Sequence, residues 1–371
     1  MKFTLERNTL LNLVGHAQGV VERRNTIPVL ANVLIRAVDG SVSMTATDME
    51  IEMNETIEAT VAQTGAVTAP AHTLYDIVRK LPEGAQVELS STNPNQLTLS
   101  SGRSHFKLGC LPIDDFPKMP EGDLQHKFTL ATSDLRDLID RSRFAISNEE
   151  TRYYLNGIYL HAAKQGDEPV LRAVATDGHR LARVEKPSPK GSQGIPGVIV
   201  PRKTVGEVRK LLEESQGEIE IALSESKIRF AMRGALLTSK LIDGTFPEYE
   251  RVIPSNNDKT LDVDTVALTA AADRVATISS DKTRAIKLSL SPGHLVLSAT
   301  SPEAGSATEE LEVAYEGAML EVGFNARYLL DVLQQIQGSR THISLADSAA
   351  PAIVKDPEDP SALYVLMPLR V

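Results

Sequence analysis

The chain has 371 residues, of which 42% are hydrophobic, a composition typical of a globular protein with two or three domains. It has no Trp and a single cysteine, Cys110, which excludes an internal disulfide. Because neither a signal-peptide segment nor a run of about 18 apolar residues is present, we expect a protein of the reducing cytoplasm without a membrane span. The net charge of −10 argues against nonspecific nucleic-acid binding, unless the basic residues gather on one surface.

Two helices are predicted in the first third of the chain, over residues 9–21 and 72–81, because apolar side chains recur there at helical spacing. Between them, an alternating strand follows the turn at Asp39-Gly40 and ends in Ala46-Thr47-Asp48. A further alternating strand is predicted over 85–89, after the second helix.

The same order of elements recurs in the middle third. A helix is predicted to begin at Ser133, which is a suitable N-cap, and a second helix over 202–212 leads into a strand over 218–223. Between the helices, a strand after the turn at Gly166-Asp167 ends in Ala175-Thr176-Asp177. The tripeptide from the first third is therefore repeated at an equivalent place.

The last third repeats the pattern more weakly. Helices are predicted over 266–280 and 326–338, and a strand over 341–345 follows the second of them. The turn at Pro292-Gly293 precedes a strand that contains Ser298-Ala299-Thr300, without the acidic residue of the other two copies.

The agreement in order across helix, turn and strand predicts three related units rather than an accidental match of tripeptides. An acidic residue also recurs at the seventh position of the second-helix motif in each unit, as Asp76, Glu207 and Asp331. We therefore predict an α+β fold, with three tandem copies of a domain that has two helices and antiparallel sheet. The predicted domains are 1–125, 126–253 and 254–371, joined by short polar linkers.

The predicted helices are together net basic, although the whole chain is acidic. Helices gathered on one side would therefore give a surface that engages phosphate weakly. The alternative is that Arg and Lys simply favour solvated helical positions. The cations concerned are Arg23, Arg24, Arg141, Arg143, Arg202, Lys203, Arg209 and Lys210.

The sequence contains no motif typical of phosphate-loop, dinucleotide or zinc chemistry, so we expect no cofactor and no metal. The best catalytic candidate is the pair Asp177 and His179, which would suit a hydrolase. This pair lacks a nearby nucleophile, and Asp48 at the related position has no histidine beside it. A hydrolase and a repeat scaffold that binds only proteins remain as alternative functions.

Several phrases distributed over the whole length together resemble the bacterial DNA polymerase III β subunit family, the replication sliding clamps. These phrases are Met1-Lys2-Phe3-Thr4, Leu111-Pro112, Asp115-Phe116-Pro117, Arg152-Tyr153-Tyr154-Leu155-Asn156-Gly157, Ala175-Thr176-Asp177-Gly178-His179-Arg180-Leu181, Thr238-Ser239-Lys240-Leu241, Phe246-Pro247-Glu248-Tyr249 and Met367-Pro368-Leu369-Arg370. The resemblance implies a ring-shaped homodimer that encircles duplex DNA, with helices lining the hole. It also implies a processivity factor without a catalytic site. The implied partners are the replicative polymerase, the clamp loader, translesion polymerases and repair proteins, bound through short peptide motifs.

The resemblance also implies a set of residues that contact DNA. At two of these positions, His72 and Glu149, the best-known members carry Arg and Gln. For the two adjacent tyrosines, the alternative is packing within a strand. The set is Arg24, His72, Glu149, Arg152, Tyr153 and Tyr154.

A peptide-binding pocket between domains 2 and 3 is likewise implied by the resemblance, and its apolar residues suit a cleft that receives Leu or Phe. Pro368 would stiffen the C-terminal tail, and Met367 would adapt to different ligands. The alternative is that the tail only closes domain 3, with Met367 in the core. The implied lining is Leu155, Thr176, Gly178, His179, Arg180, Leu181, Pro247, Arg251, Val252, Ser348, Val365, Met367, Pro368, Leu369 and Arg370.

We expect two protomers to join head to tail, with an edge strand of domain 1 meeting domain 3. Phe106 and Leu108 alternate with basic residues along the predicted edge strand, so they share one face. The opposing surface would carry an apolar centre and an acidic edge. The expected interface residues are Arg103, Phe106, Leu108, Ile278, Glu303 and Glu309.

Overall fold

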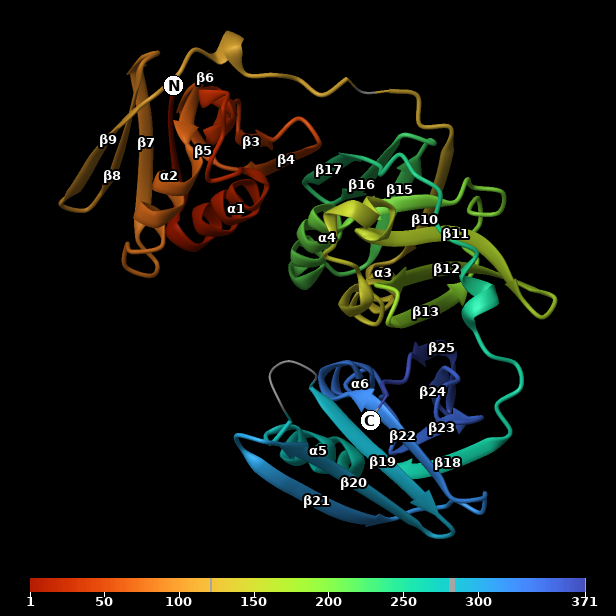
Figure 1. The fold of residues 1–371 in the computed structure, drawn as a ribbon. Coiled ribbons are helices and arrows are strands. Elements are labelled where there is room, and N and C mark those ends of the chain that lie inside the picture. The colour runs from red at the N-terminus through yellow and green to blue at the C-terminus, as the bar shows by residue number, and fades with distance from the viewer. Residues whose placement is uncertain (121, 280–283, 371) are drawn as a thin grey trace. The chain divides into compact units, whose positions relative to one another are not determined.

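The computed structural model describes residues 1–120, 122–279 and 284–370 (Figure 1). The chain divides into two compact units, and each contains segments that are far apart in sequence. Unit 1 comprises Met1–Arg136, Pro189–Pro196 and Lys203–Leu241, and unit 2 comprises Asp137–Ser188, Gly197–Arg202 and Ile242–Val371.

Unit 1 contains two antiparallel sheets and two helices that pack on each other, α1 (Arg7–Val20) and α2 (Ala71–Val78). The five-stranded sheet has the order β5-β1-β7-β8-β9, formed by β1 (Lys2–Glu6), β5 (Thr60–Gln63), β7 (Gln86–Asn93), β8 (Gln96–Ser101) and β9 (Ser104–Gly109). The eight-stranded sheet has the order β10-β15-β16-β17-β4-β3-β2-β6, formed by β2 (Asn32–Val38), β3 (Ser41–Thr47), β4 (Ile51–Glu58), β6 (Gly65–Pro70), β10 (His126–Ala131), β15 (Glu218–Leu223), β16 (Lys227–Met232) and β17 (Ala235–Lys240).

Unit 2 has the same kind of architecture, with α5 (Thr265–Ala276) packed on α6 (Ala326–Leu333). Its eight-stranded sheet has the order β14-β11-β12-β13-β25-β24-β23-β18, formed by β11 (Gly157–Gln165), β12 (Glu168–Thr176), β13 (Arg180–Pro187), β14 (Val198–Pro201), β18 (Lys259–Asp264), β23 (Arg340–Leu345), β24 (Ala352–Asp356) and β25 (Asp359–Leu366). Its four-stranded sheet has the order β21-β20-β19-β22, formed by β19 (Ala285–Ser291), β20 (His294–Ser301), β21 (Gly305–Glu312) and β22 (Leu320–Asn325). Two further helices, α3 (Thr132–Asp140) and α4 (Arg202–Glu214), contain residues of both units.

The order of elements predicted from the repeats is confirmed. Each third of the chain gives a strand, a helix, several antiparallel strands, a second helix and three more strands. Each of the two eight-stranded sheets joins strands from two thirds, because β17 pairs with β4 and β25 pairs with β13.

Several predicted helix boundaries were wrong. Ser133 is not an N-cap, because α3 already begins at Thr132. The helix predicted from Val266 begins at Thr265, where the carboxylate of Asp264 accepts the amide of Ala267 at 2.8 Å, and it ends at Ala276. Residue 280, the predicted end of this helix, lies outside the described residues. The helix predicted over 326–338 ends at Leu333.

The repeated Ala-Thr-Asp tripeptide has a structural explanation in its first copy. It forms a tight turn between β3 and β4, where Thr47 Oγ1 accepts the amide of Met49 at 2.9 Å. Asp48 Oδ1 accepts the amides of Glu50 and Ile51 at 2.9 and 2.8 Å. The side chains thereby replace the backbone partners that a strand would supply.

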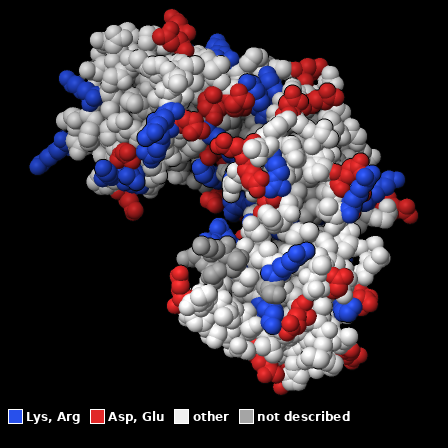
Figure 2. Space-filling model, viewed as in Figure 1, with Lys and Arg blue, Asp and Glu red and all other residues white. Residues whose placement is uncertain are grey.

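Unit 2 has an apolar cluster where β13 and β25 pair, with Leu181 opposite Val365. Among the described residues, no helix is both long enough and apolar enough to cross a bilayer. Basic and acidic side chains are interspersed on the face drawn in Figure 2. The buried members of the cluster are Leu155, Val174, Leu181, Ile199, Phe246, Tyr249, Ile353, Leu363 and Val365.

Candidate peptide-binding site

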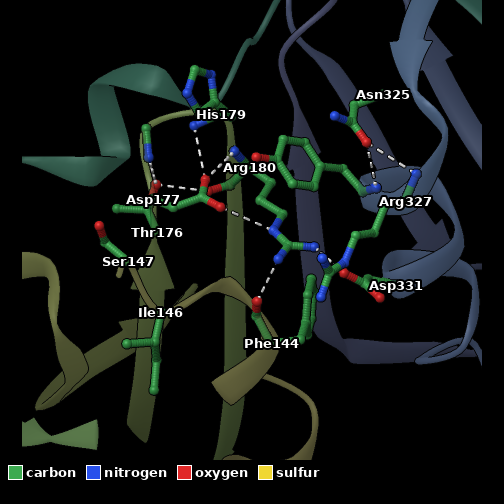
Figure 3. Close-up of polar contacts among 12 residues, drawn as sticks. Phe144, Ile146, Ser147, Thr176, Asp177, His179, Arg180, Asn325, Arg327 and Asp331 are labelled. Atoms are coloured by element: carbon green, nitrogen blue, oxygen red, sulfur yellow. Dashed lines mark hydrogen bonds and ion pairs between the residues drawn. The ribbon is translucent and has the colours of Figure 1, made fainter. Parts of the chain in front are cut away.

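A groove of about 710 Å³ lies on unit 2, and we name it the tail groove. It is formed by the turn before β13, strands β19 and β20, the start of α6 and the C-terminal tail. Figure 3 shows two of its residues, His179 and Asn325. Its lining consists of His179, Ala285, Lys287, Ser298, Ala299, Thr300, Asn325, Tyr328, Leu369 and Arg370.

The turn before β13 is the second copy of the Ala-Thr-Asp tripeptide and repeats the hydrogen bonds of the first. Thr176 Oγ1 accepts the amide of Gly178 at 3.1 Å, and Asp177 Oδ1 accepts the amides of His179 and Arg180 at 2.9 and 3.0 Å (Figure 3). Gly178 has a φ of +86°, which glycine adopts without the steric cost that other residues meet. The turn therefore presents the exposed His179 side chain to the groove.

Arg180 anchors this turn to α6. Its side chain is part of a residue only 8% exposed, and it donates to Asp177 Oδ2 at 3.1 Å, to Asp331 Oδ2 at 2.5 Å and to the carbonyl of Phe144 at 2.6 Å. The guanidinium also lies over the ring of Tyr328, 4.4 Å from its centroid. A buried charge with this many partners is a fixed structural element, so the groove is held rigidly at this wall.

The C-terminal tail crosses the groove after β25 ends. Met367 donates its amide to the carbonyl of His179 at 2.9 Å, and Leu369 donates to the carbonyl of Gly323 at 2.8 Å. Met367 is 40% exposed, which contradicts the alternative that this side chain lies in the core of domain 3. The tail is thus tied at two points while its side chains remain accessible.

The predicted pocket residues occupy different places in the structure. Leu155, Leu181 and Val365 are buried in the apolar cluster below the surface. His179, Leu369 and Arg370 line the tail groove, whereas Thr176, Gly178 and Arg180 build its turn. Pro368 is half-buried, and the remaining members are exposed: Pro247, Arg251, Val252, Ser348 and Met367.

Several lining residues were missed by the sequence analysis. Asn325 and Tyr328 stand at the start of α6, where Asn325 is the N-cap and accepts the amide of Tyr328 at 3.3 Å. A polar N-cap close to an aromatic residue at the start of a helix was the sequence signal that could have identified these two residues. The sequence identifies Asp331 as a recurring acidic position, but nothing in it indicates the pairing of Asp331 with Arg180.

Two residues of the predicted DNA-binding set bind each other. Arg152 donates to Glu149 through two nitrogens, at 2.8 and 2.7 Å, and to the carbonyl of Asp177 at 2.9 Å. This pairing lowers the pKa of Glu149 and raises that of Arg152. A role of either residue in DNA binding stays a prediction.

The two tyrosines lie in a 3-10 segment, Glu150–Leu155, so the alternative that they pack within a strand was wrong. Tyr153 is 52% exposed, whereas Tyr154 packs against the apolar cluster. In unit 1, Arg24 is exposed, and a ring nitrogen of His72 lies 3.0 Å from the carbonyl of Val21 at the end of α1. His72 therefore has a local role as a cap of α1.

Most of the basic residues noted in the sequence have intramolecular partners. Arg141 is buried and pairs with Asp359 at 2.7 Å, which removes it from any surface. Lys203 pairs with Asp48 at 2.6 Å. The other paired cations are Arg143, Arg209 and Lys210, with Asp140, Glu213 and Glu207. This pairing is consistent with a surface that engages phosphate only weakly.

The hydrolase alternative finds no support in the geometry. Both carboxylate oxygens of Asp177 are occupied by backbone amides and by Arg180, and His179 stacks on the ring of Tyr328 at 6.1 Å. Among the described residues, no group of His, Cys, Asp and Glu side chains could hold a metal ion.

The expected interface residues lie at or near two edge strands and after the end of α5. β9 is the edge of the five-stranded sheet in unit 1, where Phe106 is half-buried and Leu108 is buried. β21 is the edge of the four-stranded sheet in unit 2, where Glu309 pairs with Arg274 at 3.0 Å. Ile278 is half-buried after the end of α5, and Arg103 and Glu303 are exposed.

Comparison with known proteins gives matches along the whole chain. Residues 1–120 match the N-terminal domain of the DNA polymerase III beta subunit, residues 129–248 its central domain and residues 250–370 its C-terminal domain. The beta sliding clamp of Caulobacter vibrioides is 53% identical over 372 residues, and that of Escherichia coli K12 is 38% identical over 374, with complete coverage of each chain.

Solved structures agree with these matches. A sliding clamp from Bartonella birtlesii bound to griselimycin is similar with a TM-score of 0.96 at 49% identity, covering 100% of both chains. A Caulobacter crescentus beta sliding clamp is similar with a TM-score of 0.96 at 52% identity, covering 100% of this chain and 99% of the other. The chain therefore belongs to the DNA polymerase III beta subunit family and is a sliding clamp, a processivity factor rather than an enzyme.

Proposed function

We propose that this clamp closes as a homodimeric ring around duplex DNA in the bacterial cytoplasm. Each protomer contributes three domains, over 1–125, 126–253 and 254–371, and tethers polymerases, the clamp loader and repair proteins through short peptide motifs. The observation that supports a ring is the internal repeat. The edge strand β9 in domain 1 and the edge strand β21 in domain 3 lack the neighbouring strand that their equivalents in the other domains have.

The repeat predicts how two copies meet. The last strand of domain 2, β17, pairs with β4 of domain 1, and the last strand of domain 3, β25, pairs with β13 of domain 2. By the same rule, β9 as the last strand of domain 1 needs a partner equivalent to β4 and β13. That strand is β21 of domain 3, which is an edge strand in this chain. A second copy can supply it, and such a pairing closes a ring when it is made twice.

The register follows from equivalent positions. The hairpins pair Met232 with Ala235 and Ser101 with Ser104, so Phe106 is equivalent to Leu237, which pairs with Met53. Met53 lies opposite Ala46 in the first domain, as Ala307 lies opposite Ala299 in the third. We therefore expect Phe106 opposite Ala307 of the second copy.

The ring is tested by measuring mass in solution. Wild type should have twice the mass of one chain by light scattering, and Ile278→Asp should be a monomer because a charge would enter the apolar centre of the interface. Val266→Asp is the control, since Val266 is 75% exposed on α5 and outside the proposed interface. A monomeric wild type, or an Ile278→Asp variant of dimer mass, would remove this assignment.

We propose that the tail groove and the exposed residues above the apolar cluster bind the partner peptides. The support is an accessible groove with one wall held by the bonds of Arg180, so the protein itself loses little conformational entropy when a peptide binds. The Caulobacter crescentus clamp was solved with polyethylene glycol bound to the region assigned to beta-motif tethering, and the Bartonella birtlesii clamp was solved with griselimycin.

The groove is tested by deletion of residues 367–371. The truncated protein should remain a dimer with the thermal stability of wild type, because Met367 is exposed and outside the core. It should lose binding of peptides that end in Leu-Phe. Normal peptide binding by the truncated protein would contradict the assignment. A fall of the melting temperature by several degrees would instead show that the tail is a core element.

A further inference from the structure

A second pocket of about 500 Å³ lies beside the tail groove on unit 2, and we name it the arginine pocket. The two share His179 and Tyr328, whose rings stack 6.1 Å apart. Figure 3 shows Arg327 extending toward Arg180 and Phe144 in this pocket. Its lining consists of Arg143, Phe144, Ile146, Ser147, Asn148, Glu149, Asp177, His179, Arg180, Arg202, Arg327, Tyr328 and Asp331.

The carboxylates of the arginine pocket already have cationic partners. Asp177 and Asp331 both accept from Arg180, at 3.1 and 2.5 Å. Glu149 accepts two hydrogen bonds from Arg152. Each of these carboxylates therefore already accepts from an arginine, although Asp177 and Asp331 share one.

Two guanidinium groups in the pocket have no carboxylate partner among the described residues. Arg202 donates to the carbonyls of Ile146, at 3.4 Å, and of Ser147. The guanidinium of Arg327, one turn from Asp331 on α6, makes no hydrogen bond or ion pair within the described part of the chain. A third guanidinium, that of Arg143, pairs with Asp140 at 3.3 Å. The pocket thus presents N–H donors and positive charge to whatever enters it.

We propose that the arginine pocket binds a carboxylate side chain of the same partner peptide whose apolar residues occupy the tail groove. Guanidinium groups recognise carboxylates through paired N–H donors, and Arg202 and Arg327 have such donors free. The stacked rings of His179 and Tyr328 form the boundary that the peptide crosses between the two sites. This proposal rests on the peptide-binding function proposed above and adds a preference for acidic peptides.

A peptide explains the site better than a DNA phosphate does, because the arginine pocket shares two residues with the groove. A chain seated in the groove reaches the pocket without a gap, whereas a phosphate would have to approach it independently. The balance of charge also fits one carboxylate, since the lining carries four arginines and three carboxylates, a net charge of +1.

The test uses the full-length protein and amidated peptides that contain Leu-Phe. In the first pair, one peptide carries three Asp residues before Leu-Phe and the other carries three Asn residues there. In the second pair the same residues follow Leu-Phe, so that the peptide can reach the arginine pocket from either end. Fluorescence anisotropy gives the Kd of each peptide for wild type, for the Arg202→Ala, Arg327→Ala double variant and for Arg340→Ala. Arg340 is exposed at the start of β23 and lines neither pocket, so it controls for the loss of positive charge.

Wild type should bind one Asp peptide about threefold to tenfold more tightly than its Asn partner, as expected for partly exposed charge pairs. The preference should disappear in the double variant, persist in Arg340→Ala and weaken as salt rises to 0.5 M. Equal binding of Asp and Asn peptides by wild type would overturn the proposal while leaving the groove intact. An unchanged preference in the double variant would also overturn the proposal, and weaker binding of short duplex DNA by that variant would assign the arginines to phosphate instead. Failure of all four peptides to bind would refute the proposed groove itself.

Discussion

At the scale of single residues, two neighbouring arginines differ in their surroundings. Arg141 is 4% exposed and contacts Asp359 at 2.7 Å and Tyr364 Oη at 3.3 Å, and burial raises the pKa of Tyr364 to about 12. Arg143 is half-exposed and pairs with Asp140. In the sequence both arginines belong to the same predicted helix and cannot be distinguished. Their different roles arise from tertiary packing.

Replacing these arginines should therefore have different effects on stability. Arg141→Ala leaves Asp359 and Tyr364 without their buried partner, and we expect a loss of about 3 kcal/mol in the free energy of unfolding. Arg143→Ala should cost less than about 0.5 kcal/mol, because its ion pair is exposed to solvent. Thermal unfolding of both variants compares them, and equal melting temperatures would contradict the account.

His161 gives unit 2 a dependence on pH. Burial lowers the pKa of its imidazole, aided by the neighbouring Arg172, and its ring nitrogen lies 3.0 Å from Tyr249 Oη. Below about pH 6.5 the unfolded chain takes up a proton that the folded state resists, so stability falls as pH falls below that value. His161→Gln should reduce the difference in melting temperature between pH 7.5 and pH 5.5. An unchanged difference would show that other groups cause it.

At the scale of elements, the sequence identified the helices better than their ends. Helical spacing of apolar residues located α1, α2 and α4 to within a few residues. The end of α6 at Leu333 was missed, because the following Gln334 and Gln335 are good helix formers. The apolar half of the candidate site was predictable from strand alternation, whereas the Arg180–Asp331 pair joins residues too distant in sequence for any local signal.

The two copies of the Thr-Asp turn allow a matched pair of substitutions. Met49 has a φ of +75°, in the left-handed region, and occupies the place of Gly178 in the second copy. Met49→Gly should relieve backbone strain and raise stability by up to about 1 kcal/mol, because it is largely exposed and loses little packing.

Gly178→Ala should have the opposite effect. A Cβ at Gly178 would lie 2.4 Å from Nη1 of Arg152, and the positive φ is unfavourable for alanine. We expect a loss of about 1 kcal/mol in stability and weaker binding of Leu-Phe peptides, since the turn carries His179. Thermal unfolding and anisotropy measure the two effects. Wild-type peptide affinity in Gly178→Ala would show that the turn does not shape the groove.

At the scale of the whole molecule, one repeated rule accounts for the two eight-stranded sheets and for the free edges at β9 and β21. The tail groove lies at the repeat junction in unit 2. In unit 1, Lys203 of α4 reaches the first copy of the turn, where its ammonium binds Asp48 and the carbonyl of Val20. In unit 2, the corresponding turn is bound by its own Arg180, which leaves the adjoining surface open.

We propose that the protein holds DNA by enclosing it rather than by tight phosphate contacts. The most direct test loads the clamp with its clamp loader onto nicked circular DNA in about 0.15 M salt, removes free protein by gel filtration and measures the bound clamp before and after the circle is cut. A ring should remain on the intact circle and be lost once free ends allow it to slide off. Equal retention on circular and linear DNA would contradict enclosure and would indicate ordinary electrostatic binding.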